Sequence, residues 1–89
     1  VSGEIAYKIA QKMKEISKDR QVFCITHLPQ VAASGDHHLH IKKQTIDSKT
    51  ITIAERLDEN MKIEEIAKMI SKGDITSASR NLAKELLSR

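Results

Sequence analysis

One continuous apolar run constrains the fold of this sequence more than any other feature. Residues Gln21–Thr26 contain Val-Phe-Cys-Ile with no polar residue in between. A strand that is apolar on both sides is typical of a sheet covered on both faces, usually a parallel sheet. A helical pattern precedes it, and the polar connection Lys18–Arg20 has the length of an αβ loop. The sequence contains no second run of this kind, so it predicts an incomplete sheet whose neighbouring strands come from elsewhere.

The other apolar patterns predict helices and a hairpin around this strand. Apolar residues at helical spacing indicate helices, and strict alternation indicates half-buried strands. Pro29 suits the first position of a short helix. Asp-Ser between two alternating runs predicts an antiparallel hairpin with a loop of about five residues. The predicted order is α-β-α(short)-β-β-α-α, of the α/β class: helix Ser2–Lys18, strand Gln21–Thr26, helix Pro29–Ala33, strands His38–Thr45 and Thr50–Leu57, and helices Lys62–Ser71 and Ser77–Ser88.

The core is expected to be aliphatic, because aromatic residues make up only 2% of the chain. Such a core is small for a self-sufficient domain of 89 residues, and it suggests that part of the surface binds a partner. The side chains expected to face inward lie on one stripe of each long helix: Ile5, Ile9, Met13 and Ile16, widened by Ala6 and Ala10; Ile63, Ile66, Ala67 and Ile70; and Leu82, Leu86 and Leu87.

Composition excludes several classes of protein. The net charge is +3, with 15 basic and 12 acidic residues interspersed, which is not the dense basic footprint of a nucleic-acid-binding domain. A single cysteine, Cys24, excludes an intramolecular disulfide and fits a reducing cytoplasm. No apolar run reaches the ~20 residues that span a membrane, and no signal peptide is visible. Because the sequence begins at Val1 without methionine, we expect it to be part of a longer chain.

Thr26-His27 is the first candidate site, since it follows directly after the apolar strand. In open α/β sheets, ligands bind beyond the carboxyl ends of the strands. A histidine there can donate to a phosphate oxygen, accept a proton or bind a metal. The alternative is a strand-terminal histidine that bonds only to a neighbouring carbonyl. Ser34 and Asp36 follow at short range, but nothing orients them into a nucleophile–His–Asp arrangement.

The second candidate is the histidine-rich stretch Asp36, His37, His38 and His40. Histidines beside a carboxylate can bind zinc or nickel, but this stretch has no distant second pair of ligands. We interpret it as the polar face of an edge strand and assign no metal site. The paired carboxylates Asp58-Glu59 and Glu64-Glu65 are interpreted as helix-start charges. The sequence contains neither GxxxxGK[ST] nor GxGxxG, so it offers no loop of its own for a nucleotide triphosphate.

The sequence resembles the C-terminal end of the RecN family of bacterial DNA double-strand-break repair proteins, which are related to SMC proteins and ABC-type ATPases. The resemblance lies in VSGEIAYKIAQKMKEIS and QVFCITHLPQVAASGDHHLHIKK. It implies that residues 1–89 are the C-terminal lobe of a P-loop ABC-type ATPase head, without Walker A, Walker B or signature motif. His27 would be the switch histidine of the H-loop, with Thr26 supporting it. Val1, Ser2 and Gly3 would end the D-loop, which crosses the dimer interface near the nucleotide.

The resemblance also implies cofactors and partners. The full-length protein would bind ATP and Mg²⁺ and hydrolyse ATP in recombinational DNA repair, whereas these residues alone would bind no cofactor and would not be catalytic. The implied partners are the N-terminal half of the same head, a second head in a homodimer, and DNA, in the bacterial cytoplasm at the nucleoid and without a membrane. Unpaired strand edges would favour self-association of the isolated chain. The residues themselves leave one alternative, a small basic nucleic-acid-binding module that uses Lys8, Lys12, Lys14 and Lys18.

Overall fold

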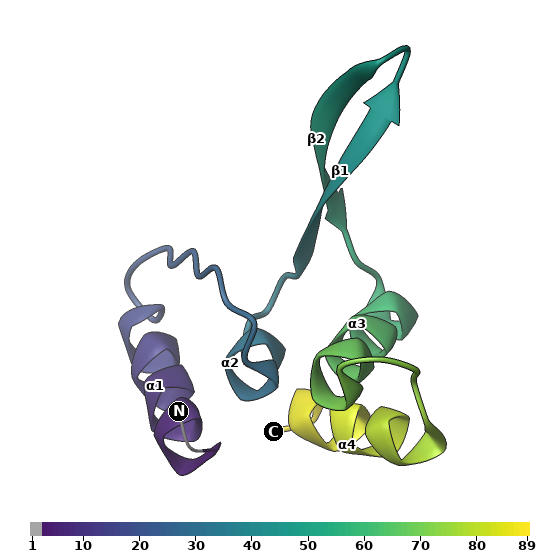
Figure 1. Ribbon diagram of the computed structural model, residues 1–89. Coiled ribbons are helices and arrows are strands. Elements are labelled where there is room, and N and C mark those ends of the chain that lie inside the picture. Colours follow the sequence, from purple (N-terminus) through teal and green to yellow (C-terminus); the bar gives the residue numbers. More distant parts are fainter. Residues whose placement is uncertain (1–2) are drawn as a thin grey trace.

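The computed structural model describes residues 3–89 as a mixed α/β arrangement of helices and one β-hairpin (Figure 1). This confirms the hairpin and the helices of the predicted order, although several boundaries and one strand differ. In chain order the elements are α1 (Gly3–Ile16), α2 (Pro29–Ala33), β1 (Leu39–Ile46), β2 (Lys49–Arg56), α3 (Glu59–Ser71) and α4 (Ser77–Leu87). Within residues 3–89, none of the helices combines the length and the apolar character needed to cross a membrane.

The core lies where α2, α3 and α4 meet. Ile66 of α3 is 1% exposed, and the neighbouring Ala67 is fully buried. Ala33 of α2 and two residues of α4, Ala83 and Leu86, complete the buried cluster. The three alanines allow the helix backbones to approach closely. The face predicted for α3 is therefore confirmed, since Ile63 and Ile70 also pack against this cluster.

The inward face predicted for α1 is confirmed at Ala6 and Ala10 but wrong at its isoleucines. Ile5, Ile9 and Ile16 are 53%, 41% and 42% exposed, while Ala6 and Ala10 are buried. The physical reason is that α1 packs only against α2, a helix of five residues. So short a neighbour covers a narrow strip, and the alanine side of α1 fits closest against it.

The last helix differs from its prediction in a similar way. Leu86 is buried and Leu87 is half-buried, but Leu82 is 40% exposed. Ser79 is buried instead, because its backbone N–H donates to Thr76 Oγ1 (3.0 Å) and its hydroxyl accepts from the Thr76 N–H (2.9 Å). This capping box satisfies the polar groups of Ser79, so a small polar side chain can occupy the inner face.

The predicted strand Gln21–Thr26 is also wrong for this chain. Residues 21–28 form neither helix nor strand, and no backbone–backbone hydrogen bond joins residues 21–27 to another part of the described chain. Phe23 is 80% exposed and Ile25 is completely exposed. A strand needs a neighbour for its backbone hydrogen bonds, and the hairpin pairs only with itself. The sheet is thus smaller than predicted, with β1 and β2 as its two strands.

The hairpin is confirmed, with a shorter turn than expected. The antiparallel register runs from Leu39 opposite Arg56 to Ile46 opposite Lys49, which leaves Asp47 and Ser48 as a two-residue turn. Both turn residues have positive φ, 50° and 64°. Paired positive φ values match the right-handed twist of the strands, and this explains why the loop closes after two residues.

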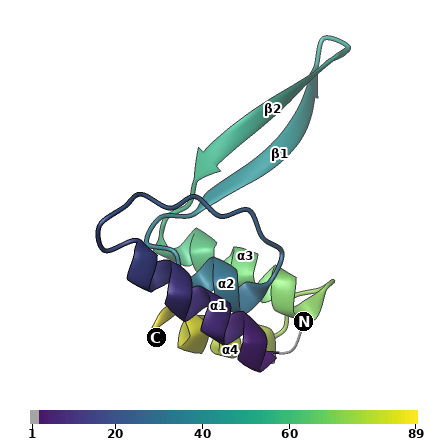
Figure 2. The same ribbon diagram turned by 90° about the vertical axis from the view of Figure 1, so that its left-hand side faces the viewer.

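The hairpin projects away from the helices, as both views show (Figures 1 and 2). The Leu57 N–H donates to the His38 carbonyl at 3.0 Å, which closes the base of the hairpin. The radius of gyration is 14.3 Å, against about 12 Å expected for a compact chain of this length. The accessible surface is 6883 Å², against roughly 5,200 Å² expected for a protein of this mass. Much apolar surface therefore remains uncovered.

Candidate functional site

Thr26-His27 lies just before α2, in a local turn that is formed by the side chain of Thr26. The Leu28 backbone N–H donates to Thr26 Oγ1 at 3.0 Å, a local side-chain bond typical of such turns. The Leu28 carbonyl then accepts from the N–H groups of Val31 (3.1 Å) and Ala32 (2.9 Å), which begins the helix. The imidazole of His27 is exposed and makes no hydrogen bond or ion pair with the described residues 3–89. The hydrogen bond from His27 to a neighbouring carbonyl, which the alternative interpretation expects, is therefore absent from the described residues. The side-chain hydrogen bond of this turn is made by Thr26.

The helix after the turn anchors it to the packed part of the molecule. Val31 and Ala33 are 5% and 7% exposed, so α2 is held firmly despite its length. In contrast, Val22, Phe23 and Ile25 before the turn are exposed. His27 thus stands at the boundary between an uncovered segment and the core, with its ring nitrogens open to an approaching ligand.

The start of α1 lies beside the start of α2. A Cβ atom placed on Gly3 would lie 3.2 Å from Gln30 Nε2, so a larger residue would require the glutamine side chain to move. Gln30 follows His27 by three residues. The structure therefore brings Gly3 near the helix that follows His27. Val1 and Ser2, the other residues predicted for the D-loop, lie outside the described residues.

The histidine-rich stretch does not converge on a common point. His38 Nε2 lies 3.1 Å from the Gly35 carbonyl oxygen, and His40 Nε2 lies 3.5 Å from Glu65 Oε1. The Lys14 ammonium donates to Asp36 Oδ1 at 2.6 Å. Across residues 3–89 we find no group of three His, Cys, Asp or Glu side chains that could hold a metal ion.

Two lysines contact the loop before β1. The hydrogen bond and positive charge of Lys14 lower the pKa of Asp36. Burial lowers the pKa of His38, although its bond to the Gly35 carbonyl acts in the opposite direction. Lys62 of α3 donates to the Asp36 carbonyl at 3.2 Å. Asp36 therefore connects this loop to both α1 and α3, and we assign it a structural role.

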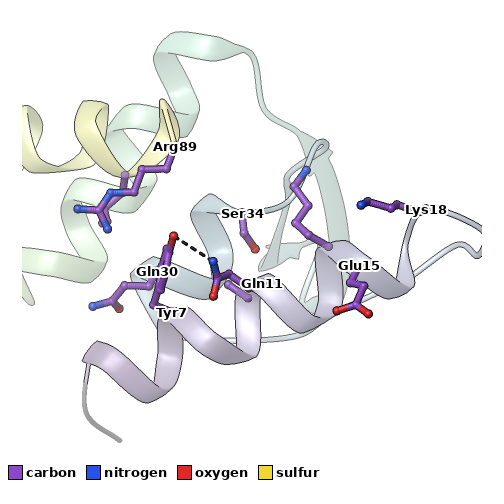
Figure 3. A pocket seen from close by; sticks show the side chains of 10 residues that line it. Tyr7, Gln11, Glu15, Lys18, Gln30, Ser34 and Arg89 are labelled. Carbon is purple, nitrogen blue, oxygen red and sulfur yellow. Dashed lines mark hydrogen bonds between the residues drawn. The ribbon is translucent and has the colours of Figure 1, made fainter.

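A cleft of about 510 Å³ lies between α1, α2 and α4 and was not predicted from the sequence (Figure 3). Its residues come from three separate parts of the chain, so no local motif indicates it. The lining includes Tyr7, Gln11, Lys18, Gln30, Ser34 and Arg89. Tyr7 and Arg89 stand at one end and Glu15 and Lys18 at the other.

Together, the fold and the exposed turn define a mixed α/β unit with a large uncovered apolar surface. No family model matches the chain. It is 46% identical over 87 residues to the DNA repair protein RecN of Halalkalibacterium halodurans and, equally, to that of Bacillus subtilis. It is 39% identical over 87 residues to the DNA repair protein RecN of Vibrio cholerae. The chain belongs to the RecN family.

These alignments cover 98% of the chain but only 15% to 16% of each relative. The chain thus spans a small part of the length of the curated relatives that it matches.

Proposed function

We propose that this chain acts in DNA repair as the C-terminal lobe of an ABC-type ATPase head of a RecN protein. The observation that carries the proposal is the identity of 39% to 46% to RecN proteins over 87 residues. Under this proposal the protein works on DNA at the nucleoid in the bacterial cytoplasm, and a second head completes the homodimer.

The uncovered surface of the chain supports this proposal. The accessible area of 6883 Å² exceeds the value for a compact protein by roughly 1,700 Å². One partner in a standard protein interface buries only about 800 Å². We propose that the N-terminal half of the same head covers this surface and pairs with residues 21–26 as a neighbouring strand. In the isolated chain the same surface should cause self-association, which light scattering would detect as species larger than a monomer.

His27 is the proposed switch histidine. The loose transition state of phosphoryl transfer is stabilised by positioned hydrogen-bond donors, and an exposed imidazole N–H can be one such donor to the γ-phosphate. Thr26 supports it by closing the turn through its bond to the Leu28 N–H. Gly3, with Val1 and Ser2, is the proposed end of the D-loop.

The chain alone does not fit ATP and Mg²⁺. Its sequence has no phosphate-cradling loop, and its described residues have no metal-binding cluster. The residues that hold the nucleotide and the metal must therefore come from the rest of the head. Isothermal titration of ATP into the 89-residue chain should show no binding, and tight binding would contradict this part of the proposal.

The decisive experiment is His27→Ala in a full-length RecN protein that contains this sequence. Loss of one positioned donor should lower the ATPase rate about a hundredfold or more while leaving ATP binding largely intact. His37→Ala is the matched control, since His37 is also exposed but lies beyond α2. Wild-type turnover in His27→Ala, or an equal loss in His37→Ala, would refute the assignment.

The basic face of α1 gives little support to the alternative of an independent nucleic-acid-binding module. Lys8 lies 3.6 Å from Glu4, and Lys12 lies 3.7 Å from Glu15. Lys14 is bound to Asp36. Three of the four lysines proposed for this face therefore lie beside a carboxylate. A strongly salt-dependent affinity of the 89-residue chain for DNA would revive the alternative.

A further inference from the structure

We propose that the cleft between α1, α2 and α4 binds a short acidic segment of a partner protein, with an apolar side chain of that segment inserted between the helices (Figure 3). This proposal goes beyond the role in the ATPase head and does not depend on it. The cleft volume of about 510 Å³ is within the range of sites that hold a ligand or a few side chains.

The cleft exists because α2 is so short. This helix of five residues packs against α1 on one side and against α3 and α4 on the other. It holds α1 and α4 apart, and the backbones of α1 and α4 do not contact each other. At one end, the Arg89 guanidinium lies 6.0 Å from the centre of the Tyr7 ring and bridges the gap. Such an exposed cation–π contact contributes only about 0.5–1 kcal/mol, so a ligand can displace it.

The interior of the cleft is apolar. Ala10 of α1 and Leu86 of α4 are 5% and 9% exposed and line the cleft. The Tyr7 ring adds an aromatic wall, with its hydroxyl accepting a hydrogen bond from Gln11 Nε2 at 3.1 Å. An apolar side chain that enters this space would bury its own surface together with that of the lining.

The rim is basic. Lys14, Lys18 and Arg89 line the cleft together with one carboxylate, Glu15. That carboxylate also lies 3.7 Å from the ammonium of Lys12, which does not line the cleft. Three cations and one carboxylate thus line the rim. The cleft therefore complements an occupant that carries negative charge.

Lys18 is the rim cation most available to an incoming ligand, because no carboxylate in the described part of the chain forms an ion pair with it. The Arg89 guanidinium lies 3.4 Å from Glu85 Oε1. Lys14 binds Asp36, but both side chains are about half-exposed or more. Exposed ion pairs of this kind contribute little, so they can be exchanged for bonds to an acidic partner.

The apolar interior favours a peptide over a nucleic acid. Nucleic acids bind through many phosphate contacts across an exposed basic surface, and here only three cations surround an apolar space. A peptide offers carboxylates for the rim, a side chain for the interior, and backbone groups for the polar side chains of Gln11, Gln30 and Ser34.

The test uses a full-length RecN protein that contains this sequence and a fluorescein-labelled peptide, acetyl-Glu-Asp-Leu-Phe-Asp-Glu-amide, measured by fluorescence anisotropy. Lys18→Glu should weaken binding about five- to tenfold, because it reverses the charge at the rim. Lys8→Glu makes the same change of charge on α1 outside the cleft, and it should change the affinity by less than about twofold. Tyr7→Ala should also weaken binding, since it removes the aromatic wall.

If the wild-type protein does not bind the peptide, the proposal is refuted. It is also refuted if Lys18→Glu and Lys8→Glu weaken peptide binding equally, because that result would indicate general charge attraction. Tighter binding of a short DNA duplex that also depends on Lys18 would assign the cleft to nucleic acid instead. Circular dichroism checks that each variant is folded. If Tyr7→Ala unfolds, Gln11→Glu adds a negative charge to the same wall and should weaken peptide binding, and an unchanged affinity would count against the cleft.

Discussion

Two isoleucines provide a direct test of where the core of this chain lies. Ile66 in α3 is 1% exposed, whereas Ile25 in the segment before α2 is completely exposed. The sequence pattern alone would bury both, because it predicts a covered strand around Ile25. Changing each of them to alanine removes the same three carbon atoms from the two environments. We expect Ile66→Ala to destabilise the chain strongly and Ile25→Ala to have almost no effect.

The magnitude follows from the burial of Ile66. Removing three buried carbon atoms at about 0.8 kcal/mol each costs roughly 2.4 kcal/mol. The cavity among Ala33, Ala67 and Ala83 adds to this cost, since backbone-linked alanines can relax only partly. The higher helix propensity of alanine returns a few tenths of a kcal/mol. The net loss is about 3 kcal/mol, out of a total stability of roughly 4–13 kcal/mol for a chain of this length.

The assay is urea unfolding followed by far-UV circular dichroism at a protein concentration where the chain is monomeric. Ile25→Ala should shift the free energy of unfolding by no more than about 0.5 kcal/mol, as at other exposed positions. A similar loss in both variants would mean that residues 21–26 pack against the chain after all. A loss below about 1 kcal/mol in Ile66→Ala would mean that the core is elsewhere.

Three further changes test local features. Thr76→Ala removes the hydroxyl that caps α4 through the Ser79 N–H and should cost about 1 kcal/mol in urea unfolding; an unchanged midpoint would contradict the cap. Lys14 lowers the pKa of Asp36 in the folded chain. The Asp36 carboxylate therefore stabilises the fold above its unfolded pKa of about 4, and this stability is lost as the pH falls through the folded pKa. Asp36→Asn should therefore reduce the loss of stability below about pH 4, and an identical acid profile would argue against the pair. Ser48→Gly relieves a φ of 64° and should stabilise the hairpin by roughly 0.5 kcal/mol; faster amide hydrogen exchange in β1 would oppose this.

Sequence reasoning succeeded where an element has a broad neighbour. The aliphatic face of α3 meets α4 and α2, and both Ile66 and Ala67 are inside as the helical spacing predicts. For α1 it succeeded only at Ala6 and Ala10, because periodicity identifies an apolar stripe but does not tell how much of that stripe a neighbour covers. Ile5 and Ile9 are exposed beside a helix of five residues.

The candidate site shows the same division. The position of Thr26-His27 after an apolar run identified it as a candidate from the sequence. Its geometry, a turn closed by Thr26 with an exposed His27 imidazole, could not be predicted from the sequence. The cleft beside Tyr7 and Arg89 could not be found at all, because its lining comes from residues far apart in the chain.

By itself, the sequence determined the local elements and the RecN family, because helical spacing, turn chemistry and motif residues act over a few neighbouring positions. Only the tertiary structure decided which apolar faces are buried. Burial depends on what another element brings within contact, and a sheet strand depends on a neighbour for its hydrogen bonds. For residues 21–26 that neighbour is absent from the described chain, so the most apolar stretch of the sequence lies among its most exposed residues.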